Sequence, residues 1–199
     1  MNAQPATESA ATQPPLAAPP PHLRRLVLTG FMGAGKTTVG RLLAQRIAWD
    51  FLDLDALIES RTGLTVPSIF ATHGEARFRQ LESSALASAL GRGNIVLALG
   101  GGAPETLTNR LLLEQTPATA TVFLDAPFPV LFDRCMLQDQ ARPVLADPVA
   151  AEARFLARHP VYRRLARLTV DTASLTPEET VTALLDRLTC TLRSLPNRP

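Results

Sequence analysis

Residues 30–37, GFMGAGKT, constrain the possible fold of this chain more than any other stretch. They match the pattern G-x-x-x-x-G-K-[ST]. The match lies between a short apolar run typical of a strand and a segment with the apolar spacing of a helix. Glycines at 30, 33 and 35 allow the backbone to turn its N–H groups toward phosphate oxygens, and the following helix N-terminus adds a positive field. The motif therefore predicts a nucleotide-binding loop in an α/β fold.

Lys36, inside this loop, is the only lysine in the chain, because the 20 Lys+Arg residues include 19 arginines. An ammonium is a compact charge on a flexible stem that can reach the β- and γ-phosphates, a role that a planar guanidinium does not fill. Thr37 offers a hydroxyl to Mg²⁺. The guanine-specificity signature N-K-x-D of GTPases is absent, since it requires a second lysine.

The rest of the chain alternates between short apolar runs and segments with helical spacing. Five runs are predicted to be strands, at about 25–29, 51–55, 94–100, 119–125 and 167–172. Their continuous apolar character is typical of strands covered on both faces. This alternation predicts a parallel sheet with helices on both sides, which binds ligands at the carboxyl ends of its strands.

The ends of the chain differ from its middle. Residues 1–22 hold six of the 17 prolines and one charged side chain, Glu8, so we expect a disordered tail. Residues 23–195 are predicted to form one domain, followed by a short tail at 196–199. The last helix of the domain has strong start signals, with Thr176 and Glu179 spaced as a capping box around Pro177.

Composition excludes several classes of protein. A net charge of +2 with 19% charged residues gives no reason to expect a nucleic-acid partner. Cys135 and Cys190 form no CxxC motif and are expected to be free thiols in a reducing compartment. No apolar run approaches the ~18 residues that span a bilayer, and no signal-peptide pattern begins the chain. We therefore expect a cytoplasmic protein with no membrane partner.

The acids of the DLD stretch allow two interpretations. Alternation along a strand puts Asp53 and Asp55 on one side, where they could support a metal–water shell and bind an attacking hydroxyl. Alternatively, Asp55 could simply cap the helix that follows.

The segment GEARFRQLE places Glu75, Arg79 and Glu82 on one face of a helix. Such a group is usually a solvated surface pair of little energetic value. The alternative is that Glu82 holds Arg79 rigid so that its planar fork can bind a substrate carboxylate.

Three further stretches are candidates for ligand contact. The three glycines of LGGGAP leave backbone N–H groups open to close approach, although a plain strand-to-helix turn is the alternative. Arg142, in the polar stretch QARPVL, could close over the phosphates as part of a lid. HPVYRR, at 159–164, supplies an arginine pair before the fifth strand.

Taken together, these motifs resemble the shikimate kinases, in the nucleoside-monophosphate-kinase-like branch of P-loop proteins. The resemblance covers about residues 25–185 and rests on G-x-x-G-x-G-K-[ST], D-x-D, G-E-x-x-F-R-x-x-E, G-G-G, R-P and Y-R in family order. It implies a three-layer fold with strand order 2-3-1-4-5, a substrate-binding region at about 53–82 and a lid at about 138–152. It also implies a monomer that transfers the γ-phosphate of ATP to the 3-hydroxyl of shikimate with Mg²⁺.

On the acceptor side, the resemblance assigns the reacting hydroxyl and its proton to Asp55. Arg79 and Arg163 would bind the substrate carboxylate, with Glu82 orienting Arg79. The backbone of Gly100, Gly101 and Gly102 would contact a ring hydroxyl of the substrate.

On the nucleotide side, the resemblance places Arg134 near the base and Arg142 on the phosphates, where Lys36 and Arg142 assist the transfer. Asp53 would support the Mg²⁺ shell through water, beside Thr37. The loop residues expected to hold ATP are Gly33, Ala34, Gly35, Lys36, Thr37 and Thr38.

The chain also departs from the family pattern. It adds the Pro-rich tail, it has no arginine in VDTASLT after the fifth strand, and the segment from Arg134 to Arg142 is about a residue longer. Two rival functions stay open from sequence. A gluconate-type kinase would share the phosphate loop but lack the two-arginine carboxylate site with the glycine triplet. A nucleotide-gated regulatory module would lack one of the catalytic side chains.

Overall fold

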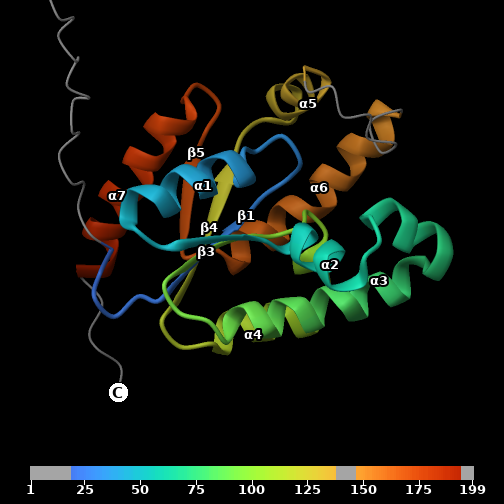
Figure 1. Cartoon of the computed structure of the whole chain (residues 1–199). Coiled ribbons are helices and arrows are strands. Elements are labelled where there is room, and N and C mark those ends of the chain that lie inside the picture. The colour runs from blue at the N-terminus through green and yellow to red at the C-terminus, as the bar shows by residue number, and fades with distance from the viewer. Residues whose placement is uncertain (1–18, 138–146, 194–199) are drawn as a thin grey trace, which may run out of the picture.

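The computed structural model describes residues 19–137 and 147–193. A parallel sheet forms the centre, with helices on both sides (Figure 1). Its strands are β1 (Arg25–Thr29), β2 (Asp50–Asp53), β3 (Ile95–Ala98), β4 (Thr119–Asp125) and β5 (Leu168–Asp171). The helices are α1 (Lys36–Ile47), α2 (Leu54–Thr62), α3 (Val66–Leu90), α4 (Leu107–Gln115), α5 (Phe128–Met136), α6 (Pro148–Leu165) and α7 (Pro177–Arg193), with a 3-10 turn η1 (Ala103–Glu105) after β3.

The strand order is β2-β3-β1-β4-β5 and all four pairings are parallel, which confirms the predicted fold. β1 lies in the middle, so the loop that follows it opens at the centre of the carboxyl edge. The predicted strands at 25–29 and 119–125 match β1 and β4, whereas β3 and β5 are slightly shorter than expected at each end.

The two faces of the sheet are covered by different helices, with α1 and α7 on one side and α3 and α4 on the other (Figure 1). Alternation along β1 divides the core accordingly. Leu26 and Leu28 pack in the same cluster as Leu43 of α1, whereas Val27 packs with Leu86 of α3. All five side chains are fully buried, so the central strand is fixed from both faces by the hydrophobic effect.

The prediction of a strand at 51–55 is wrong at its carboxyl end. β2 stops at Asp53, and Asp55 lies in the first turn of α2. Asp53 is the N-cap of that helix, because its side chain accepts hydrogen bonds from the backbone N–H groups of Asp55 and Ala56. The two acids therefore meet through a strand-to-helix turn and not through alternation, and the capping residue is Asp53 instead of Asp55.

The start of α7 and the interruption of α3 both follow from the residues at those positions. The capping box of α7 is confirmed, since Glu179 N–H donates to Thr176 Oγ1 at 3.2 Å and Thr176 N–H donates to Glu179 Oε2 at 2.8 Å. α3 is interrupted at Gly74, whose φ of 75° and ψ of 172° are not helical. None of the helices that the structure describes combines the length and the apolar character of a membrane span.

Candidate active site

The phosphate loop joins β1 to α1 through glycines that no other residue could replace without strain. Gly33 has φ 78°, and a Cβ there would lie 2.4 Å from the carbonyl oxygen of Leu131. Gly35, with φ 84°, is the residue before α1. Lys36 Nζ donates to the carbonyl oxygens of Gly30 and Phe31, both at 3.0 Å. The lysine thus folds back over the loop, and its ammonium lies where phosphate oxygens are expected.

Thr37 and Asp53 are brought together although they are 16 residues apart. Thr37 Oγ1 donates to Asp53 Oδ2 at 2.9 Å, and the other oxygen of Asp53 caps α2. Hard oxygen ligands beside a phosphate cradle suit Mg²⁺, which commonly keeps several waters and uses substrate phosphates as ligands. The described residues contain no cluster of three or more acidic, His or Cys side chains that could hold a metal by themselves.

Asp55 is partly buried near the start of α2. Burial, and then the neighbouring Asp53 carboxylate, raise the pKa of Asp55 above its ordinary value, while Lys36 acts in the opposite direction. A Cβ at Gly100 would lie 2.8 Å from Asp55 Oδ1 and 3.3 Å from Glu82 Oε1. The carboxylates of Asp55 and Glu82 therefore converge on the first glycine of the triplet.

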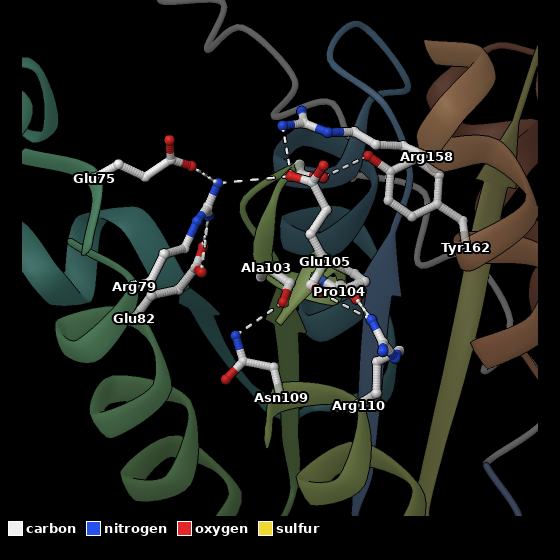
Figure 2. Close-up of polar contacts among 11 residues, drawn as sticks. Glu75, Arg79, Glu82, Ala103, Pro104, Glu105, Asn109, Arg110, Arg158 and Tyr162 are labelled. Atoms are coloured by element: carbon white, nitrogen blue, oxygen red, sulfur yellow. Dashed lines mark hydrogen bonds and ion pairs between the residues drawn. The ribbon is translucent and has the colours of Figure 1, made fainter. Parts of the chain in front are cut away.

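Arg79 is held by the acids of its own helix, as the spacing predicts (Figure 2). Its Nη1 donates to both oxygens of Glu82, at 3.2 and 3.0 Å, and its Nη2 donates to Glu75 at 3.1 Å. Glu82 is fully buried, and burial raises the pKa of Glu82 despite the opposing charge of Arg79. The acids outweigh burial at the arginine and raise the pKa of Arg79. A pair in which one partner is buried and both of its oxygens accept from Arg79 Nη1 positions the arginine and is not a solvated surface pair.

The glycine triplet makes room for these side chains. A Cβ at Gly102 would lie 2.5 Å from Arg79 Nη2, which is closer than van der Waals contact allows. The carbonyl oxygen of Gly101 accepts a hydrogen bond from the hydroxyl of Tyr162, which is buried in α6. The close contacts therefore fall at the first and third glycines, whereas a Cβ at Gly101 would lie at an ordinary contact distance of 3.7 Å from both Arg158 and Tyr162.

The structure does not bring Arg163 to this group. Arg163 is exposed and lines a separate pocket with Phe155 and His159, which precede it at helical spacing. Arg158 lies at the glycine triplet instead. Its Nη2 donates to Glu105 Oε2 at 2.7 Å, and a Cβ at Gly101 would lie 3.7 Å from its Nη1. The assignment of Arg163 to the carboxylate site has no support from the geometry.

Helical spacing could have placed Arg158 on the inward face of its helix, although only the packing of α6 shows that this face meets the glycine triplet. Tyr162 is the one tyrosine of the chain, and an aromatic residue marks the face of α6 that packs inward. Arg158 is one turn before Tyr162 and shares that face, whereas Arg163 shares the face of His159. The Y-R pair in the sequence therefore indicated Arg163, which lies on a different face of α6 from Tyr162.

Of the two arginines expected near the nucleotide, one is described. Arg134, on α5, donates from Nη1 to Thr172 Oγ1 at 3.2 Å and from Nη2 to the carbonyl oxygen of Ala173 at 3.2 Å. Arg134 thus binds the loop after β5. The family pattern has an arginine near adenine in this loop, and this chain has none there. Arg142 lies outside the described residues, as does most of the predicted lid, and the segment from Pro148 to Glu152 opens α6.

Phosphoryl transfer to an acidic small molecule needs a phosphate cradle, a group that binds the acceptor hydroxyl and a site for the acceptor's negative charge. This end of the sheet offers candidates for all three. The class defined by the fold and the site is therefore that of the P-loop small-molecule kinases.

Comparison with known proteins narrows this class. The family model described as shikimate kinase matches residues 32–189. A shikimate kinase of Geobacter sulfurreducens is 44% identical over 164 residues, covering 81% of this chain and 88% of that protein. One of Bordetella pertussis is 42% identical over 171 residues, covering 84% of this chain and 80% of that protein. This chain belongs to the shikimate kinase family.

A solved structure agrees with the sequence relatives. Shikimate kinase from Acinetobacter baumannii in complex with shikimate has a TM-score of 0.74 and 35% identity to this chain, covering 88% of this chain and 96% of that one. The family match, the strand order and the structural match all indicate an enzyme of the shikimate kinase type.

Proposed function

We propose that this protein is a shikimate kinase that transfers the γ-phosphoryl group of ATP to the 3-hydroxyl of shikimate. The observation that carries the proposal is the arrangement at the glycine triplet, where Asp55 and Arg79 meet beside the phosphate loop. In the reaction the hydroxyl oxygen bonds to the γ-phosphorus as the bond to the bridging oxygen breaks. ADP leaves, and the hydroxyl proton passes to Asp55 or to water.

Asp55 is proposed to bind and orient the acceptor hydroxyl. Because the pKa of Asp55 is raised, its carboxylate is a better proton acceptor than a solvated aspartate, while the charge of Lys36 nearby favours the ionised form. Phosphoryl transfer depends mainly on positioning and charge neutralisation, so orientation is the larger part of its contribution.

The carboxylate of the substrate is proposed to bind between Arg79 and Arg158. The name "carboxylate grip" is used below for these two residues. Both guanidinium groups reach the same oxygen of Glu105, at 3.6 and 2.7 Å, so a carboxylate in that position contacts both at once. Arg158 takes the role that the sequence resemblance assigned to Arg163.

On the nucleotide side, Lys36 and the loop backbone are proposed to bind the phosphates, and Thr37 with Asp53 to hold Mg²⁺, in part through water. The ion would neutralise charge on the β- and γ-phosphates. Arg134 is proposed to support the base indirectly, because it binds the carbonyl groups of the loop after β5. The role of Arg142 on the phosphates rests on the family resemblance.

The decisive experiment measures ADP release with ATP and Mg²⁺ in three parallel reactions, with shikimate, with gluconate and without acceptor. ADP formed only with shikimate is the expected result. Turnover with gluconate alone would contradict the proposed substrate but retain the phosphate loop. ATP binding without any acceptor-dependent ADP would favour the regulatory module.

A further inference from the structure

Glu105 occupies the carboxylate grip with a carboxylate of the protein's own (Figure 2). It ends the 3-10 turn η1 directly after the glycine triplet, so its backbone is attached to the substrate site. Its Oε2 lies 2.7 Å from Arg158 Nη2 and 3.6 Å from Arg79 Nη2. No motif in the sequence marks this residue, because its two partners lie on α3 and α6.

The three acids around the grip differ in burial. The side chain of Glu82 is 1% exposed and is held by two hydrogen bonds from Arg79, so it is a fixed part of the site. The side chains of Glu75 and Glu105 are 67% and 42% exposed, so each can leave its arginine for water at low cost. Of these two, only Glu105 contacts both arginines.

We infer that Glu105 is an internal competitor of the substrate carboxylate and thereby sets the affinity and the selectivity of the site. This inference rests on the proposed function, because it assumes that the incoming carboxylate binds to the same two arginines. In the free enzyme Glu105 pairs with both arginines and accepts a hydrogen bond from Arg158 Nη2. An incoming substrate must displace it, so weakly bound anions that lack further contacts are rejected.

The test uses Glu105→Gln, which keeps the shape and a hydrogen-bond acceptor but removes the charge. Glu114→Gln is the matched control, because Glu114 is exposed on the adjacent helix α4 and the net charge changes equally. Calorimetry without nucleotide is expected to give a Kd for shikimate about three- to tenfold lower in Glu105→Gln and unchanged in Glu114→Gln. The KM should fall with the Kd, while kcat stays within about twofold.

Two ligands make the test specific for charge. Benzoate, which offers a carboxylate without the ring hydroxyls, should also bind more tightly to Glu105→Gln. The uncharged methyl ester of shikimate should bind both proteins equally. Glu105→Ala, which removes the side chain altogether, should reproduce the tighter binding if Gln still obstructs the site, and thermal melting verifies that each variant is folded.

Unchanged or weaker binding of shikimate and benzoate by both folded Glu105 variants would overturn the inference, because Glu105 would then support the arginines and not compete for them. The failure of the proposed function gives a different result. A wild-type chain without shikimate-dependent ADP formation contradicts that function, whereas the benzoate comparison still reports on the two arginines.

Discussion

The phosphate loop and the carboxylate grip lie at the same end of the sheet but are built in different ways. The loop is one continuous stretch, whose glycines and Lys36 carry the whole pattern. The grip combines Arg79 of α3 with Arg158 of α6, and both meet Glu105 of η1. A site made by consecutive residues can be recognised from sequence, whereas a site made by distant helices depends on how these pack.

The largest effect is expected at the point where the two regions meet. Asp55→Asn removes the carboxylate that is proposed to bind the acceptor hydroxyl and should lower kcat by roughly 10³-fold. ATP binding should be retained, because the proposed phosphate contacts come from the loop backbone and Lys36 and not from Asp55. Steady-state kinetics and nucleotide titration measure the two quantities. An unchanged kcat would remove Asp55 from the reaction.

Within the loop, Lys36→Arg tests whether charge alone is sufficient. The planar guanidinium cannot reproduce the two hydrogen bonds that Nζ donates to Gly30 and Phe31. We expect kcat/KM to fall about 100-fold although the net charge is the same. Near-normal turnover by Lys36→Arg would show that the loop depends on charge and not on shape.

In the grip, Arg158→Ala and Arg163→Ala form a matched pair on one helix. Loss of a charge-assisted contact costs about 1.5–3 kcal/mol, so Arg158→Ala should raise KM for shikimate by roughly 10- to 100-fold. Arg163→Ala should leave KM within about twofold, because Arg163 lines a different pocket. The reverse ranking would restore the assignment made from the sequence.

A smaller effect is expected behind the grip. Tyr162→Phe removes the hydrogen bond to the carbonyl oxygen of Gly101 and leaves that oxygen without this buried donor. The free energy of unfolding should fall by about 1 kcal/mol, which lowers Tm by roughly 2–4 °C for a chain of this size. Calorimetric melting measures the shift, and an unchanged Tm would mean that water replaces the hydroxyl.

The smallest effect concerns stability and pH. Because the pKa of Asp55 is raised in the folded state, the folded protein holds that proton more tightly than the unfolded chain. The ionised carboxylate therefore costs stability, and this cost develops as pH rises from about 3.8 through the folded-state pKa. Asp55→Asn should raise Tm slightly at pH 7, and the difference should shrink toward pH 4. A difference that grows in acid would contradict the raised pKa.

The elements show which inferences a sequence supports. The capping box at Thr176 and Glu179 was predictable because its two bonds join residues three apart. The predicted strand at 51–55 extends beyond the end of β2 at Asp53. The apolar pattern continues through Leu54 into α2, although the Asp53 side chain already caps that helix. Periodicity alone does not reveal where a strand ends and a cap begins.

What the sequence by itself determined is the phosphate loop, the order of strands and helices, and the pairing of Arg79 with Glu82, because each follows from residues within one turn or one motif. The tertiary structure alone decided that Arg158 and not Arg163 faces the glycine triplet, and that Glu105 lies between two arginines. Those contacts join residues 53 and 26 positions apart. Their geometry depends on how helices pack on the sheet, and a periodic pattern within one segment carries no record of that packing.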